Sequence, residues 1–354
     1  MQVNEEAYIK GRGAQLNTHN KFLKNSYVTE HIEGLDEEYH PEGKTQLFYE
    51  NARKIVNRVE SPDIPGMYSM NPYQGCEHGC IYCYARNAHE YWGFSAGLDF
   101  EQKIVVKQNA AELLKKQFES KKWEVAPIMF SGNTDCYQPT ERRLKITRSM
   151  LEVCLEYKHP VSMITKNALI TRDLDILTEM AKQNLVHVMV SITSLDEDLR
   201  LLMEPRTATA KQRLKTVETL VLNGIQTGVM VAPIIPGLNS DEIPKIIKAA
   251  AEHGAHTAGY TIVRLNGAIK DIFHDWLYKS FPDRADKVWN QICDCHGGDV
   301  EDKQWGRRMR GSGNIADMIN QLFVTAKKKH LPNTSFSFNT SAFQRPPKGQ
   351  LSLF

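Results

Sequence analysis

The sequence predicts an α/β fold built on a parallel sheet. From residue 67 onward, short runs of β-branched and apolar residues alternate with longer stretches whose apolar residues recur at helical spacing. This alternation is the pattern of repeated βα units, of which about six can be distinguished. At 354 residues the chain is long enough for one large α/β domain with extensions, because a complete (β/α) barrel takes about 250 residues.

The individual elements follow from local patterns. Strands are expected at residues 69–71, 127–131, 161–165, 186–192, 228–235 and 258–265. Helices are expected between them at residues 109–120, 140–157, 172–183, 210–222 and 241–252. Gly224 and Gly254 stand where glycine commonly ends a helix, and Pro236 ends the strand before it. Strands and helices therefore alternate through this region.

The segments on either side of this region differ from it in character. Residues 1–66 lack sustained periodicity and predict an irregular N-terminal extension that wraps the core. Residues 67–266 make up the predicted βα core, and residues 267–340 predict a C-terminal helical cover with a glycine-rich interruption at residues 305–314. Residues 341–354 predict an exposed tail.

Composition and charge narrow the classes of function. The hydrophobic content of 41% and the charged content of 24% are ordinary for a globular protein. Lys and Arg total 44 against 42 Asp and Glu, so any contact with phosphates must come from local patches. No signal peptide is expected, and the longest uncharged run, residues 219–240, is interrupted by Pro233 and Pro236, which argues against a membrane span. We expect a cytosolic protein.

Three cysteines carry the most specific signal in the chain. Cys76, Cys80 and Cys83 form a C-x3-C-x2-C loop rich in glycine. Three thiolates at this spacing can bind three irons of a [4Fe–4S] cube, which normally takes four cysteines, and leave the fourth iron open to a small ligand. A structural zinc site that adds His78 is the alternative, but such sites usually pair two short chelating turns, and no second turn follows. Disulfides are disfavoured by the odd count of seven cysteines.

With Tyr82 directly before the last cysteine, this loop closely resembles that of the radical S-adenosylmethionine (SAM) enzymes. The resemblance implies that the open iron chelates the amino and carboxylate groups of SAM. It implies that one electron then cleaves SAM to methionine and a 5′-deoxyadenosyl radical. It also implies a partial (β/α)6 barrel and an electron donor such as flavodoxin or ferredoxin. A cluster protein that only senses redox state is an alternative from another class.

The ends of the predicted strands supply candidate SAM ligands, because ligands collect at the carboxyl ends of parallel strands. Asn133, Thr134 and Asp135 stand where the family often binds the SAM amino group, although Asp135 also suits a helix cap. Lys166 ends the next strand, where an ammonium in an apolar mouth needs an anionic partner. In relatives of spore photoproduct lyase, a lysine at this place meets the SAM carboxylate. The alternative is a solvated lysine at the rim.

Later strand ends give weaker candidates. The resemblance implies that hydroxyl groups here contact the ribose, that an arginine pairs with a carboxylate, and that backbone and apolar side chains flank the adenine. The alternative is that these residues are ordinary core. The candidates are Ser191, Thr193, Arg206, Ala232 and Ile235.

Cys136 has two readings of equal weight. It follows a strand end, and photoproduct lyases use a cysteine on the corresponding loop, so it is a candidate catalytic residue that donates a hydrogen atom to a substrate radical. It comes a few residues later than theirs, and the alternative is a small buried thiol. Cys293, Cys295 and His296 lie within four residues of one another, too few to complete a second cluster, and we expect no metal there.

The resemblance extends over most of the chain to a bacterial branch related to spore photoproduct lyase. It rests on residues 69–93, 134–139, 165–166 and 309–313, and residues 11–19 resemble the N-terminal extension of one subgroup. It implies a carbon–carbon lyase that repairs DNA; RNA, peptide and small-metabolite substrates remain alternatives. Residues 305–313 combine arginines with Trp305, which suits phosphates and bases, unless these arginines pair with the acidic residues at 294–302.

The tail carries one further motif. Pro346, Pro347 and Gly349 predict an extended linker. The last five residues resemble the pentapeptide by which bacterial repair and replication proteins dock on the DNA polymerase sliding clamp. The alternative is that they cover the protein's own surface, since so short a motif often matches by chance. These residues are Gln350, Leu351, Ser352, Leu353 and Phe354.

Overall fold

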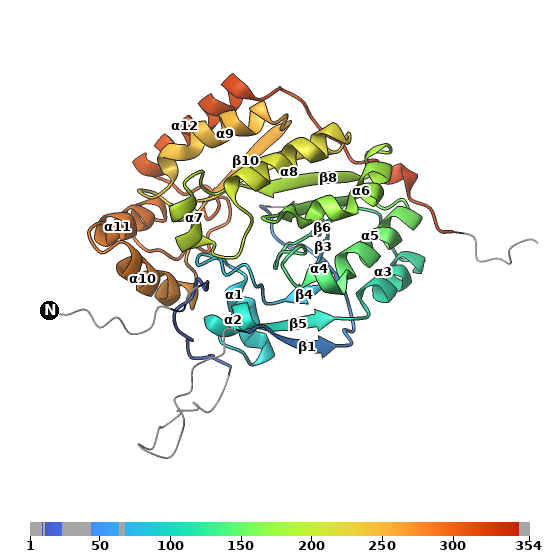
Figure 1. Cartoon of the computed structure of the whole chain (residues 1–354), viewed down its shortest axis with the longest axis horizontal. Coiled ribbons are helices and arrows are strands. Elements are labelled where there is room, and N and C mark those ends of the chain that lie inside the picture. Colours follow the sequence, from blue (N-terminus) through green and yellow to red (C-terminus); the bar gives the residue numbers. More distant parts are fainter. Residues whose placement is uncertain (1–8, 10, 23–43, 64–67, 347–354) are drawn as a thin grey trace, which may run out of the picture.

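The main sheet follows the chain from one edge to the other. The structure, a computed structural model, describes residues 9, 11–22, 44–63 and 68–346. Within them a seven-stranded sheet has the order β10-β9-β8-β7-β6-β3-β2 (Figure 1). Its strands are β2 Val56–Arg58, β3 Tyr68–Met70, β6 Ile128–Phe130, β7 Val161–Thr165, β8 Val186–Ser191, β9 Gln226–Ile234 and β10 Thr257–Ile262.

The sheet is open, as expected for a partial barrel. Its strands β3, β6, β7, β8, β9 and β10 pair in parallel, and β2 adds an antiparallel edge beside β3. The register pairs Thr165 of β7 with Val190 of β8, and Ser191 of β8 with Met230 of β9. The carboxyl ends of successive strands therefore meet at one rim, where the predicted ligands follow them.

Helices cover the outer face of this sheet (Figure 1). Side chains such as Val188 and Val229 are fully buried in the largest apolar cluster, which includes residues of both the strands and the helices. Buried parallel strands of this kind lie between layers of helix in α/β folds. The covering helices are α3 Ala110–Glu119, α5 Ile146–Glu156, α6 Leu174–Ala181, α8 Ala210–Leu222 and α9 Ile243–Glu252.

One predicted helix is broken, and the prediction of a continuous helix there was wrong. Lys145 adopts a left-handed conformation (φ 55°), so the segment predicted as 140–157 divides into α4 Glu141–Leu144 and α5. Apolar spacing continues through the break, which is why periodicity did not reveal it. The helix predicted at 172–183 is α6, and a 3-10 turn, Ala168–Asp173, precedes it.

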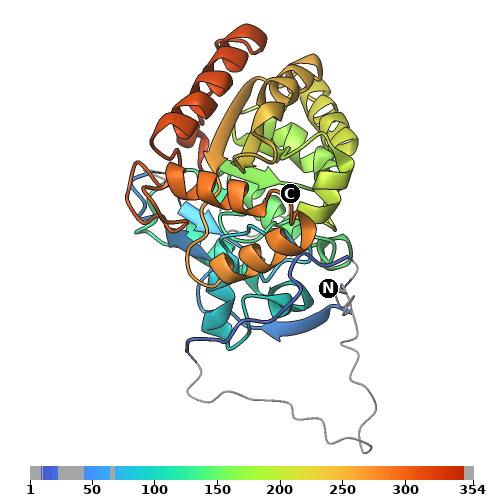
Figure 2. The same cartoon turned by 90° about the vertical axis from the view of Figure 1, so that its left-hand side faces the viewer.

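The C-terminal region is helical, as expected. Helix α12 packs on α9 and β10, and Figures 1 and 2 show it along that flank of the sheet. The indole N–H of Trp276 in α10 donates to the carbonyl of Leu202 in α7 (3.0 Å). These elements are α7 Glu197–Met203, α10 Ile269–Ser280, α11 Ala285–Cys295 and α12 Asn314–His330.

The N-terminal part contributes more regular structure than its composition indicated. Besides β2, it supplies β1 Gln46–Glu50, which pairs in parallel with β5 Lys103–Lys107, while β4 Tyr73–Gln74 pairs with β5 on the other side. These strands are too short for periodicity to predict. The remaining elements are α1 Arg86–His89, α2 Leu98–Gln102, and the 3-10 turns Glu90–Trp92, Ser240–Glu242 and Thr340–Ala342.

Two predictions concern the ends of the chain and the membrane. The predicted clamp-binding residues, 350–354, lie outside the described residues. Among the helices that the structure describes, none has the length and apolar character needed to cross a bilayer.

Candidate active site

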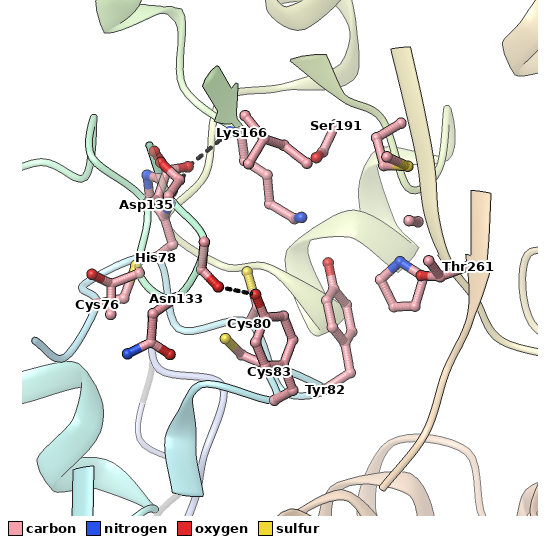
Figure 3. Close-up of a pocket in the computed structure, with 18 of the residues that line it drawn as sticks. Cys76, His78, Cys80, Tyr82, Cys83, Asn133, Asp135, Lys166, Ser191 and Thr261 are labelled. Atoms are coloured by element: carbon pink, nitrogen blue, oxygen red, sulfur yellow. Dashed lines mark hydrogen bonds and ion pairs between the residues drawn. The ribbon is translucent and has the colours of Figure 1, made fainter. Parts of the chain in front are cut away.

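A cavity lies at the rim where the parallel strands end. The cysteine loop closes one side of it, and residues from the ends of β6, β7, β8, β9 and β10 form the other sides. Figure 3 shows Cys80, Cys83 and Lys166 pointing into this space. Its empty volume, including the part open to solvent, is about 1250 Å³. In parallel α/β folds, ligands bind in concave sites of this kind at the carboxyl ends of the strands.

Buried side chains stabilise the backbone of the cysteine loop. The guanidinium of Arg86, which follows the loop, donates to the carbonyl of Cys80 (3.0 Å) and pairs with the carboxylate of Glu101. Glu101 also accepts from the backbone N–H groups of Gly13 (3.1 Å) and Ala14 (2.8 Å). Arg86 and Glu101 are fully buried, and burial makes such a pair costly to break. The N-terminal segment is thus tied to the loop.

Glycine makes this close approach possible. A Cβ on Gly13 would lie 1.8 Å from the carbonyl oxygen of Gly79, within the cysteine loop. Gly79 itself has a positive φ of 69°, and a Cβ there would lie 2.8 Å from the Glu101 carboxylate. Any side chain at either position would push the N-terminal segment and the loop apart. The segment at residues 11–17 is therefore part of the site's support.

The three thiols fit the demands of an iron–sulfur cluster. All three line the cavity, and none is in a disulfide. Burial raises the pKa of each thiol, and for Cys76 the nearby Asp135 carboxylate and the other two thiols raise it further. Thiolates gathered in such a place require a positive partner, which bound iron supplies. The donor set therefore fits the predicted [4Fe–4S] cluster.

A zinc site completed by His78 fits less well. The Nδ1 atom of His78 lies 3.3 Å from Oδ2 of Asp135, and its Nε2 atom lies 3.2 Å from the side-chain nitrogen of Asn167. Both ring nitrogens are therefore engaged, which leaves neither free for a metal.

Asp135 joins the cysteine loop to the strand ends. Its carboxylate accepts from the hydroxyl of Thr165 (2.8 Å), the N–H of Lys166 (2.8 Å) and the N–H of Tyr137 (2.9 Å), besides the contact with His78. Burial works to raise the pKa of Asp135, but His78 and these hydrogen bonds outweigh it and lower the pKa. An ionised Asp135 thus fixes the wall of the cavity between β6 and β7.

A second buried carboxylate stands behind Lys166. The Lys166 ammonium lies 4.0 Å from Oε1 of Glu204 and 5.7 Å from the centre of the Tyr82 ring. Glu204 is fully buried and accepts from the hydroxyls of Tyr82 and Thr193 and from the guanidinium of Arg213. Burial opposes its ionisation, but Arg213 and Lys166 outweigh burial and lower the pKa of Glu204 to about 2. This network orients Lys166 and Tyr82 at the cavity.

Comparison with known proteins agrees with this geometry. The model of the radical SAM superfamily matches residues 70–250, which include the cysteine loop and β6 to β9. The chain belongs to the radical SAM superfamily. Enzymes of this superfamily use a [4Fe–4S] cluster and SAM, and these are the cofactors expected at the three thiols.

Individual relatives extend the comparison. An uncharacterized protein of Mycobacterium tuberculosis is 33% identical over 236 residues, covering 65% of this chain and 69% of the relative. An uncharacterized protein of Methanocaldococcus jannaschii is 28% identical over 249 residues, covering 70% of this chain and 88% of the relative. The structure of spore photoproduct lyase complexed with dinucleoside spore photoproduct matches with a TM-score of 0.59 at 16% identity, over 85% of this chain and 86% of that one. At that identity the likeness describes the fold.

Most of the predicted SAM ligands of this radical SAM protein do line the cavity. Asn133 and Thr134 lie there beside Asp135, and their side chains donate to Gln74 (2.9 Å) and to the carbonyl of Tyr73 (2.7 Å). The other predicted ligands on the wall are Tyr82, Lys166, Ser191 and Ala232. The carboxyl ends of four parallel strands thus bring these predicted ligands together at the cavity. Their contact with SAM stays a prediction.

Four predicted residues lie off the wall. Thr193 sits behind it, bonded to Glu204, and Arg206 pairs with Glu77 (3.8 Å). Ile235 is fully buried in a second apolar cluster near the C-terminal helices. Cys136 is fully buried, its N–H donates to the hydroxyl of Ser131 (2.9 Å), and burial raises the pKa of its thiol. Their predicted roles in catalysis or SAM binding remain predictions.

Other residues on the wall were not predicted. Tyr84 directly follows Cys83, is 51% exposed and donates to the carbonyl of Gly132. Arg264 follows β10, where the strand-end rule that found Lys166 applies equally. Met309 arrives from the loop at residues 305–313, and no local pattern indicates that this loop reaches the cavity.

The arginines of that loop are largely held by the protein itself. Arg307 pairs with Asp302 (2.7 Å), and Arg308 pairs with Asp63 (2.6 Å) and stacks on Trp305 (3.6 Å). The alternative, that these arginines pair with the acidic residues at 294–302, therefore holds for Arg307, whereas the partner of Arg308 lies elsewhere in the chain. His296 contacts Asp302 (3.2 Å) and the carbonyl of Val263 (2.7 Å), a structural role.

Proposed function

We propose that this radical SAM enzyme acts on DNA, as a carbon–carbon lyase of the kind related to spore photoproduct lyase. The observation that carries the proposal is the likeness in fold, over 85% of the chain, to that lyase complexed with a dinucleoside spore photoproduct. The half-exposed ring of Tyr84 and the guanidinium of Arg264, both on the wall of the cavity, support it. Aromatic faces and arginines are the groups that bind bases and phosphates.

The chemistry divides between the cofactors and the chain. When bound, the cluster supplies one electron that cleaves SAM to methionine and a 5′-deoxyadenosyl radical, which abstracts a hydrogen atom from the substrate. Cys76, Cys80 and Cys83 would hold the cluster. Lys166, oriented by Glu204, would bind the SAM carboxylate, because its ammonium lies in the cavity with donors to spare.

The walls of the cavity serve a second purpose. Met129, Ile164 and Met230 place apolar surface along it, which limits the water around a reactive radical. Ser191 would contact the ribose of SAM, and Ala232 would flank the adenine, as the resemblance implies. These residues come from β6, β7, β8 and β9, so the sheet positions all of them.

An anaerobic assay tests the proposed substrate. Reconstituted protein is incubated with SAM, reductant and UV-damaged DNA that contains spore photoproduct, and both 5′-deoxyadenosine and restored thymine are measured. We expect both products with damaged DNA and no change in undamaged DNA. Formation of 5′-deoxyadenosine without repair would favour the alternative substrates, RNA, a peptide or a small metabolite. A full cluster without SAM cleavage would favour the redox-sensing alternative.

We also propose partners outside the cavity. Flavodoxin or ferredoxin would supply the electron, in the reducing cytosol that suits an oxygen-sensitive cluster. The tail residues Gln350–Phe354 would dock on the sliding clamp. Within the segment predicted as an exposed tail, Arg345 donates to the carbonyl of Phe118 (2.9 Å) and Phe343 packs against the main apolar cluster. Residues 343–345 are therefore held on the body and are not part of an exposed tail. Titration of the intact protein with the cognate clamp should show binding that is lost when residues 350–354 are deleted; no binding by the intact protein would contradict the proposal.

A further inference from the structure

The cavity contains a positively charged side chain, that of Arg264, which has no proposed role in SAM binding. Arg264 comes two residues after β10, and its side chain lies on the cavity wall. The backbone is held on both sides of it: the N–H of Val263 donates to Ile234 (2.9 Å), and the N–H of Leu265 donates to Val300 (3.0 Å). The guanidinium therefore projects from a fixed point at the rim.

The protein leaves this guanidinium largely unpaired. Within the described residues its contacts are a weak hydrogen bond to the sulfur of Met309 (3.4 Å) and the face of the Tyr84 ring (6.0 Å). Asp63 and Asp302 influence it electrostatically. Each of them, however, is hydrogen-bonded to another arginine, Asp63 to Arg308 (2.6 Å) and Asp302 to Arg307 (2.7 Å). Among the residues that the structure describes, no carboxylate is therefore paired with Arg264 to balance its positive charge.

Burial makes that charge significant. It lowers the pKa of Arg264, and the nearby positive charge of Arg308 lowers it further. A half-buried cation facing a cavity is stabilised by an anion. A guanidinium binds phosphate with two parallel N–H donors, which makes it the side chain best suited to that anion.

Lys166 and Arg264 approach the cavity from different sides. Strands β8 and β9 separate β7, which precedes Lys166, from β10, which precedes Arg264. Three strand spacings correspond to roughly 14 Å of sheet. If the carboxylate of SAM is held at Lys166, Arg264 remains available to a different anion, on the side of the cavity where Tyr84 exposes its ring.

We propose that Arg264 binds a backbone phosphate of the substrate, next to a base that contacts Tyr84. The inference rests on the proposed function, because it takes the substrate to be a DNA strand. It adds that the charge of the phosphodiester strengthens recognition, so that a neutral linkage between the same two bases is bound more weakly. Arg264 would then be a specificity-determining residue of the substrate side of the cavity.

Two dinucleotides that differ only in charge test this. Dinucleotide spore photoproduct with its natural phosphodiester, and the same photoproduct with an uncharged methylphosphonate linkage, are titrated into the SAM-bound holoenzyme by anaerobic calorimetry. We expect the wild type to prefer the charged linkage by about tenfold or more, as for a hydrogen bond to a charged group. Arg264→Gln should lose this preference, and Arg264→Lys should keep part of it. Arg284→Gln removes the same charge at an exposed position away from the cavity and should keep all of it.

The outcomes separate this inference from the proposed function. Equal binding of both dinucleotides by the wild type, or an unchanged preference in Arg264→Gln, would overturn the role of Arg264 and leave a DNA substrate intact. A weaker SAM affinity in Arg264→Gln would also overturn it, because Arg264 would then serve the cofactor. Binding of neither dinucleotide by the wild type would overturn the proposed substrate, and the inference with it.

Discussion

Two buried carboxylates near the cysteine loop, those of Glu101 and Glu204, differ in the groups that they bind. Both are fully buried, and each pairs with a fully buried arginine, Arg86 or Arg213. The further hydrogen bonds of Glu101 come from backbone N–H groups of the N-terminal segment. Those of Glu204 come from side chains, the hydroxyls of Tyr82 and Thr193, and Lys166 lies within 4.0 Å.

The two carboxylates therefore support different features of the site. Glu101 and Arg86 act on the path of the backbone, since Arg86 also donates to the carbonyls of Cys80 and Gly97. Glu204 acts on the position and charge of side chains that reach the cavity. Similar ion pairs therefore predict different consequences when they are broken: loss of the loop in one case, and loss of cofactor binding in the other.

The largest effect is expected at Glu101. Glu101→Gln leaves the buried guanidinium of Arg86 without its counter-charge, and breaking such a pair costs about 3–5 kcal/mol of unfolding free energy. We expect a large drop in thermal stability together with low iron content after reconstitution. Glu156→Gln, which removes an exposed carboxylate paired with Lys115, is the control and should change little. A stable Glu101→Gln protein with full iron would contradict this role.

Removal of a cluster ligand should leave both carboxylate networks in place. Cys80→Ala is expected to lose the cluster, its brown colour and SAM cleavage, while the apoprotein stays folded. Cys293→Ala, half-buried on α11 and away from the cavity, should keep all three. Iron analysis and visible absorbance measure the cluster. Full cluster content in Cys80→Ala would refute the assignment.

The charge of Glu204 should make stability depend on acid. Its pKa falls from 4.5 to about 2 on folding, so its contribution is present above about pH 4.5 and is lost as pH falls toward 2. The shift corresponds to on the order of 3 kcal/mol. Denaturant unfolding of the wild type and of Glu204→Gln should show the gap in stability narrowing as pH falls through this range. A gap that stays constant would mean that Glu204 folds uncharged.

A smaller effect is expected at the side chain that Glu204 orients. Lys166→Ala should retain the cluster but weaken SAM binding by about 1.5–3 kcal/mol, or roughly 10- to 150-fold, through loss of a charge-assisted hydrogen bond. Lys182→Ala, which removes an exposed lysine paired with Glu179, is the control. An unchanged SAM dissociation constant in Lys166→Ala would mean that Lys166 is a solvated lysine at the rim of the cavity and does not bind SAM.

The smallest effect on SAM cleavage is expected at Cys136. Its thiol is buried off the cavity wall, so Cys136→Ala should still form 5′-deoxyadenosine. If the thiol donates a hydrogen atom to a substrate radical, the variant should yield altered or quenched products, as read by mass spectrometry. Cys154→Ala, a buried thiol within α5, controls for packing. An unchanged product spectrum would make Cys136 a packing residue.

Local pattern predicted the scaffold of this site, and long-range contacts determined the rest. The cysteine loop, the six parallel strands and Lys166 were readable because spacing, alternation and strand ends are local properties. The roles of Glu101 and Glu204 were not, because their partners Gly13 and Tyr82 lie 88 and 122 residues away. Arg264 also follows the end of a strand, so the same local property indicates it, although it was not among the predicted site residues.

The most direct test of the account measures 5′-deoxyadenosine. Anaerobically reconstituted protein is mixed with SAM and a strong reductant, and the products are quantified for the wild type and for Cys80→Ala. If the protein cleaves SAM at a cluster held by the three cysteines, we expect 5′-deoxyadenosine and methionine in equal amounts from the wild type, and neither from the variant. A wild-type protein that holds a complete cluster and binds SAM, yet releases no 5′-deoxyadenosine, would contradict it.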